Sequence, residues 1–236
     1  MLIQAALAAL RQTFSPPLRA ILWKSLGLTL GILLLTWIGL TRLIQWFQAS
    51  HPIAQAYPLL DSLAYLLAGF GLFVALAYVM PAVSILVAGF FLDDAAAIVE
   101  RTDFPGDPPG RAMPWGTAIL YALRFAGLTL LINLAALVVF FVPVVGLAAF
   151  FAANAYLLAR EYFEMAAARF RPLPEAAAMR RRFSPTTLAA GCLLAGMMVV
   201  PVVNLLTPLF GIALMVHVHK RLARRLPGPA AQDRLR

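Results

Sequence analysis

The sequence predicts an all-α integral membrane protein, and two observations support this prediction. Of the 236 residues, 62% are hydrophobic and only 12% are charged, and the mean hydropathy is +0.85. A soluble domain is about half apolar and about a quarter charged. One core of this size cannot bury so much apolar surface, so the bilayer has to act as the solvent. The apolar residues also form runs of helical length separated by short polar loops.

The charged residues indicate how the chain faces the membrane. The formal net charge is +9, from 19 Lys and Arg against 10 Asp and Glu. The basic residues cluster in loops beside apolar runs, for example at residues 180–182 and 220–225. Such clusters are typical of cytoplasmic flanks next to anionic lipid. We therefore expect membrane lipids, and no nucleic acid, as partners, and both termini on the cytoplasmic side.

The first element is predicted to be an amphipathic surface helix over residues 1–14. Apolar side chains recur at spacings of four, three and four in Ile3, Leu7, Leu10 and Phe14. A helix with such a stripe lies naturally on the membrane surface. Ser15-Pro16-Pro17 ends this helix and can cap the next one.

Two long helices are predicted next, over residues 18–47 and 58–92. Each is longer than the roughly 20 residues that a helix needs to cross a bilayer. A polar interlude follows from Asp93 to Pro114, where the sequence PGDPPG excludes a continuous helix.

Two helical hairpins, over residues 115–160 and 184–220, are predicted before a basic tail at 221–236. They contain the related phrases FVPVVGLAAF and VVPVVNLLTP. Each leg of the second hairpin, residues 186–200 and 205–219, is 15 residues long. At about 1.5 Å per residue a leg measures about 22 Å, against a hydrocarbon core of about 30 Å. The second hairpin is therefore predicted to be re-entrant, which means that it enters and leaves by the same membrane face.

The predicted turns contain Pro143 and Gly146 in the first hairpin, and Pro201 and Asn204 in the second. A turn at membrane depth needs its free backbone groups buried in protein or facing water, and the Asn204 side chain can supply hydrogen bonds there. Proline-kinked helices that span fully are the alternative, chiefly for the first hairpin, whose leading leg is long enough to cross. Residues 1–236 together form a single membrane domain in this interpretation.

Several charged residues are candidates for binding or transport. Leu18 and Arg19 open a helix behind a serine cap and prolines, and free N–H groups near positive charge bind anions at such helix starts. A well-capped helix with a snorkelling arginine is the alternative. Glu100 and Arg101 follow the second long helix, and Arg124 lies inside an apolar run, so all three are candidates for a polar pathway.

We find no phosphate-binding loop, nucleophile elbow, zinc-protease motif or paired catalytic carboxylates. His217 and His219 are two residues apart, so on a helix they diverge by about 200° and do not chelate one ion. We expect no enzymatic activity, no cofactor and no metal. Arg160 and Glu164, four residues apart, are close enough to pair on one helix face. They are read either as part of a polar pathway or as a structural pair at the membrane interface.

Three stretches together resemble a known family. They are GFFLDDAAAIVE, AREYFEMAAARFRPLPEAAAMRRRF and MMVVPVVNLLTPLFGIALMVH. They are similar to the CysZ sulfate-permease family and its etoposide-induced-protein-type relatives (the EI24 domain), and the similarity covers nearly the whole chain. The resemblance implies long membrane helices with pairs of half-penetrating helices, assembled as a homo-oligomer. It also implies sulfate uptake across the bacterial inner membrane.

The resemblance also implies roles for individual residues. In the family, a Gly-Leu-Arg stretch opening the first long helix holds sulfate through backbone amides and arginine. This chain has Pro17, Leu18 and Arg19 there. Leu18 and Arg19 carry over, whereas Pro17 has no N–H, so one amide donor is missing. Glu100 and Arg101 match a pair that lines the family's pore.

The function expected from these observations is a permease or channel-like passage for a small inorganic anion, with sulfate as the first candidate. The sequence shows no nucleotide-binding or ion-coupling motif that would indicate active pumping. The alternative is a non-transporting membrane scaffold that binds lipid or a partner protein through its basic cytoplasmic loops.

Overall fold

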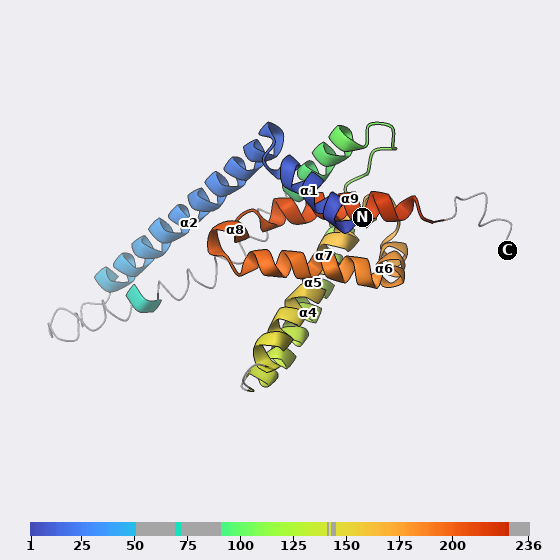
Figure 1. The fold of residues 1–236 in the computed structure, drawn as a ribbon. Helices are drawn as coiled ribbons and strands as arrows, with labels where there is room; N and C mark the ends of the chain where they lie inside the picture. The colour runs from blue at the N-terminus through green and yellow to red at the C-terminus, as the bar shows by residue number, and fades with distance from the viewer. Residues whose placement is uncertain (51–68, 72–90, 141, 143–144, 227–236) are drawn as a thin grey trace. The chain divides into compact units, whose positions relative to one another are not determined.

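The computed structural model describes residues 1–50, 69–71, 91–140, 142 and 145–226 (Figure 1). All regular elements in these residues are helices, which confirms the all-α prediction. Two of the described helices contain segments long and apolar enough to cross a membrane, Pro16–Leu43 and Gly116–Val139. Most of the helix predicted over residues 58–92 lies outside the described residues.

The chain divides into two compact units. One unit combines Met1–Arg19 with Leu92–Arg236, and the other is Ala20–Phe91. The second unit contains most of helix α2, Pro16–Ser50. In this apolar helix the hydroxyl groups of Thr36 and Thr41 donate to carbonyl oxygens four residues earlier, each at 2.8 Å. These bonds satisfy hydroxyl groups that would be costly to expose to lipid.

Helix α1, Leu2–Thr13, is amphipathic in the way the spacing predicts. Its apolar stripe is exposed, with Ile3 76% and Leu7 51% accessible. The opposite face carries Ala5 and Ala9, which are fully buried where α1 packs on α9. Small side chains on this face let the two backbones approach closely, while the larger apolar side chains stay on the exposed side.

Helices α4, Trp115–Phe140, and α5, Val145–Ala168, pack against each other as the first hairpin (Figure 1). The α5 helix continues eight residues beyond the boundary predicted at residue 160. The continuation EYFEMAAA is rich in helix-forming Ala, Glu and Met and has no Gly or Pro. Gly146 lies in the first turn of α5 and is buried, whereas Pro143 lies outside the described residues.

The second hairpin consists of α7, Ser184–Met198, and α9, Thr207–Ala223, joined through the short α8, Pro201–Asn204. Figure 1 shows α7 and α9 side by side with α8 at the bend, so the chain folds back where the sequence predicts. The two legs of 15 and 17 residues measure about 22 and 26 Å along their axes. Their depth in a membrane stays a prediction. Asn204 is exposed, and its side chain has no hydrogen-bond partner among the described residues.

The core of the larger unit is α9 together with the helices around it. This helix contacts α1, α5 and α7 and is buried on nearly all sides, including Phe210, Met215 and Val218. A helix that is apolar all round is normally a buried one. The crossing of α5 and α7 is equally close, because a Cβ added at Gly191 would overlap the carbonyl oxygen of Ala155.

Candidate functional site

Arg169, just after α5, is the centre of a buried ion-pair site. Its Nε lies 2.7 Å from Oε1 of Glu100, and its NH1 donates to the Oδ1 of Asp93. The other carboxylate oxygen of Glu100 accepts the Gly110 N–H at 2.9 Å. Only 6% of the Arg169 side chain and 5% of the Glu100 side chain are exposed. One guanidinium therefore ties the end of α5 to the helical residues 91–103 and, through Glu100, to the loop before α4.

The environment of Arg169 keeps its guanidinium charged. Burial alone would lower the pKa of Arg169, but hydrogen bonds to Glu100 and Asp93 and the charges of these carboxylates raise it overall. Arg169 and Glu100 thus form a buried ion pair, in which each partner depends on the other for compensation.

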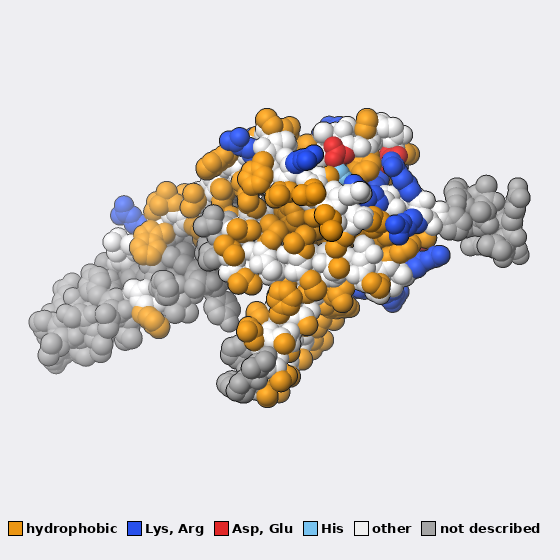
Figure 2. All heavy atoms as spheres, in the orientation of Figure 1, with side chains coloured by type: hydrophobic (Ala, Val, Ile, Leu, Met, Phe, Trp, Pro, Cys, Tyr) orange, Lys and Arg blue, Asp and Glu red, His pale blue; other side chains and the backbone are white. Residues whose placement is uncertain are grey.

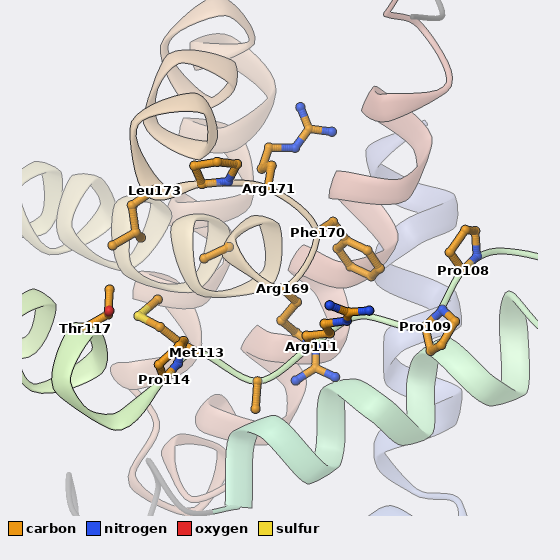
Figure 3. Close-up of a pocket in the computed structure, with 13 residues that line it drawn as sticks. Pro108, Pro109, Arg111, Met113, Pro114, Thr117, Arg169, Phe170, Arg171 and Leu173 are labelled. Atoms are coloured by element: carbon orange, nitrogen blue, oxygen red, sulfur yellow. The ribbon is translucent and has the colours of Figure 1, made fainter.

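A cavity of about 620 Å³ lies beside this ion pair (Figure 3). It is at the place where residues 108–114 pass the turn that joins α5 to helix α6 (Leu173–Arg182). Its lining includes Arg111, Arg169, Met113 and Thr117. Figure 3 shows the side chains of Arg111 and Arg169 close together, whereas Arg171 points away from both. The volume is within the range of small-molecule pockets, about 300–1,000 Å³.

A second buried carboxylate, Glu164 on α5, accepts hydrogen bonds from Arg180 and Tyr121 and forms an ion pair with Arg160. It lies 2.9 Å from Nε of Arg180 on α6, 3.1 Å from the hydroxyl of Tyr121 on α4, and 3.6 Å from Nε of Arg160. The Glu164 side chain is only 4% exposed. The pairing of Arg160 with Glu164, predicted from their spacing, is confirmed. Arg180 and Tyr121 were missed, because nothing local in the sequence connects them to α5.

A third polar cluster holds α1 against α9. Nε2 of His217 lies 3.1 Å from Oε1 of Gln12 and 3.1 Å from Oδ2 of Asp103. Burial lowers the pKa of His217, although the charge of Asp103 acts in the opposite direction. His219 does not join this cluster but stacks on Phe170, with the ring centroids 5.1 Å apart. The two histidines diverge, as expected from their spacing.

His219 leads to a prediction about pH. Burial, with the positive charges of Arg171 and Lys220, lowers the pKa of His219 to about 3, against about 6.5 in the unfolded chain. The folded protein therefore holds the neutral ring. Its contribution to stability is complete above pH 6.5 and is lost progressively as the pH falls toward 3, because only the unfolded chain takes up the proton. Between pH 7 and 5 the loss is about 2 kcal/mol.

The measurement is the thermal unfolding midpoint of the detergent-purified protein at pH 7 and pH 5. His219→Phe retains a ring for stacking on Phe170 and removes the titrating group. We expect its midpoint to fall less between the two pH values than that of the wild type. Equal falls in both proteins would contradict the assignment.

The predicted anion-binding residues lie at the start of α2. Arg19 is exposed, whereas Leu18 is fully buried. The Arg19 N–H bonds the carbonyl of Ser15 at 2.9 Å, and Pro16 and Pro17 have no N–H. Leu18 is thus the first-turn residue whose N–H is left without a partner among the described residues.

Among the described residues, no hydrogen bond or ion pair joins the predicted pathway residues to one another. Glu100 is paired with Arg169, while its neighbour Arg101 is exposed. Arg124 is exposed on α4 and forms no ion pair with any described residue. Pro201 begins α8. A buried carboxylate at Glu100 requires a cation, but the sequence spacing does not indicate which of many arginines supplies it.

Comparison with known proteins agrees with this architecture. Residues 5–208 match the family model EI24, described as Sulfate transporter CysZ/Etoposide-induced protein 2.4. A search of curated proteins finds no match. The match covers most of the 236 residues and includes most of α1, all of α2, the first hairpin and the bend of the second. This all-α membrane protein therefore belongs to the CysZ/etoposide-induced protein 2.4 family.

Proposed function

We propose that this protein is a permease or channel-like passage for a small inorganic anion, with sulfate as the first candidate. We place it in the bacterial inner membrane, with both termini cytoplasmic, as a homo-oligomer without enzymatic activity. The observation that carries the proposal is the family match over residues 5–208, whose description names a sulfate transporter. Two helices of membrane-crossing length support it.

Arg19 is the residue that we propose attracts the anion. It is exposed in the first turn of α2, where the positive end of the helix dipole adds to its charge. Pro17 leaves this site one main-chain donor short of the family's pattern. We therefore expect weak anion binding, which suits conduction because a conducted ion has to leave its site as well as enter it.

The test is the initial rate of radiolabelled sulfate uptake into proteoliposomes. Arg19→Ala is expected to lower the rate at least about fivefold, the loss of one charge-assisted contact. Lys24→Ala is the matched control, because it removes an equal charge from an exposed position farther along α2. Pro17→Gly, which restores the missing amide, is expected to tighten sulfate binding. Wild-type uptake no faster than in empty vesicles would contradict the proposal.

A scaffold that binds lipid or a partner protein is the second candidate. Arg181 and Arg182 are exposed at the end of α6, and Figure 2 shows Lys and Arg side chains gathered near the ends of α6 and α9. The double variant Arg181→Gln/Arg182→Gln leaves Arg180 in place on Glu164. Loss of binding to anionic vesicles in this variant, together with absence of sulfate uptake by the wild type, would favour the scaffold.

A further inference from the structure

The cluster around Glu164 contains more positive than negative charge. Two guanidinium groups, from Arg160 and Arg180, approach this single carboxylate. Glu161 follows Arg160 on α5, and burial raises the pKa of Glu161 to about 7. Burial thus disfavours the charged form of Glu161, which weakens its ability to offset the positive charge of the two arginines. Among the groups that contact Glu164, two guanidinium groups face one buried carboxylate.

The two arginines also have unused donors. Arg180 donates through Nε to Glu164, and Arg160 Nε is buried with no hydrogen-bond partner. In the part of the chain that the structure describes, the terminal nitrogens of both guanidinium groups donate no hydrogen bond. These terminal N–H groups are not fully buried, so they can donate to a ligand that carries several oxygens.

The cluster is open on one side. Tyr156, Arg160 and Glu164 are four residues apart and share one face of α5. Exposure decreases along this face, from 38% for Tyr156 to 25% for the Arg160 side chain and 4% for the Glu164 side chain. The guanidinium of Arg180 lies over the Tyr156 ring, with CZ 5.5 Å from the ring centroid. This cation–π contact and the hydrogen bond to Glu164 hold the Arg180 guanidinium between the buried Glu164 and the exposed Tyr156.

We propose that Arg160 and Arg180, beside Tyr156, bind a tetrahedral oxyanion. Guanidinium groups offer paired N–H donors whose geometry matches sulfate and phosphate oxygens. Glu164 holds Arg180 through its Nε. The oxyanion lies on the more exposed side of the cluster and accepts hydrogen bonds from the terminal N–H groups of the two arginines. The site is distinct from the start of α2. The choice of sulfate as probe rests on the proposed function, but a phosphate headgroup presents the same chemistry.

The experiment measures equilibrium binding of radiolabelled sulfate to the full chain, purified free of lipid in a neutral detergent. All variants carry Arg19→Ala, so that the start of α2 does not contribute. Arg160→Gln leaves Arg180 and Tyr121 on Glu164, so the carboxylate stays compensated. We expect it to bind sulfate at least about tenfold more weakly. Arg11→Gln, which removes an exposed arginine of α1 to which no binding role is assigned, is expected to bind like its parent.

Binding that is equally strong in the Arg160→Gln protein and its parent would overturn the proposal, as would an absence of binding by the parent. If Arg160→Gln does not fold, Arg160→Lys keeps the charge and loses the paired donors, and weaker binding is again expected. Sulfate binding without sulfate uptake into proteoliposomes would leave this site standing and contradict only the proposed transport.

A second arm distinguishes the two sources of the oxyanion. Phosphatidylglycerol is added to the detergent micelles at increasing amounts, with a zwitterionic lipid as the control. Displacement of sulfate by phosphatidylglycerol alone supports the site and assigns it to a lipid headgroup. Binding that is unchanged by either lipid supports the site and assigns it to the free anion.

Discussion

Replacing Arg169 with methionine is expected to destabilise the protein by about 3–5 kcal/mol, which is the usual cost of removing one partner from a buried ion pair. Methionine fills similar space but leaves the carboxylate of Glu100, only 5% exposed, without its cation. Asp93, which is 46% exposed, can return to water and adds little to the loss. For a chain of this size the thermal midpoint would fall on the order of 10 °C.

The control for this experiment is Arg101→Met. Arg101 follows Glu100 in the sequence but is exposed and is not its partner. Its replacement is expected to change stability by less than about 0.5 kcal/mol. The double variant Arg169→Met/Glu100→Gln removes both charges and should recover part of the loss. Equal effects of Arg101→Met and Arg169→Met would contradict the pairing seen in the structure.

The second large effect is expected at Gly191 on α7. A Cβ at this position would overlap the carbonyl oxygen of Ala155 and would lie 2.7 Å from the Cβ of Ala159. The obstacle is the backbone of α5, which cannot rotate away as a flexible side chain can. Gly191→Val therefore has to push α5 and α7 apart, and we expect a loss of about 3 kcal/mol or more, at the upper end of overpacking costs.

Gly196 on the same helix provides the control. Nothing lies within 4 Å of a Cβ added there. Gly196→Ala replaces a poor helix former without a clash, so stability should stay the same or rise by up to about 1 kcal/mol. Both variants are measured by thermal unfolding in detergent. A Gly191→Val protein as stable as Gly196→Ala would show that α5 and α7 do not cross as closely as described.

The fold could be predicted largely because it follows from local patterns. The apolar runs, the spacing of Ile3 and Leu7 in α1, and the break at Pro201 each depend on neighbouring residues only. The end of α5 was harder to place, because residues 160–168 are polar enough to suggest a loop. They are helical because they contain strong helix formers and pack on other helices of the same unit.

The candidate sites could be predicted only in part, for a physical reason. The pair Arg160–Glu164 follows from helix geometry, since four residues bring two side chains to one face. Arg169 and Glu100 are 69 residues apart, and Tyr121 and Glu164 are 43 apart. Such contacts depend on how the helices dock. With 19 basic residues in the chain, charge alone does not select the partner.

The docking of α1 on α9 has a consequence for biosynthesis. Gln12 and His217, which join these helices, are 205 residues apart. At roughly 5–20 residues per second, a ribosome needs about 10–40 s to make the intervening chain. During that interval α1 exists without the helix that covers Ala5 and Ala9. We expect its exposed stripe of Ile3, Leu7 and Leu10 to hold the nascent chain on the bilayer until its partner emerges.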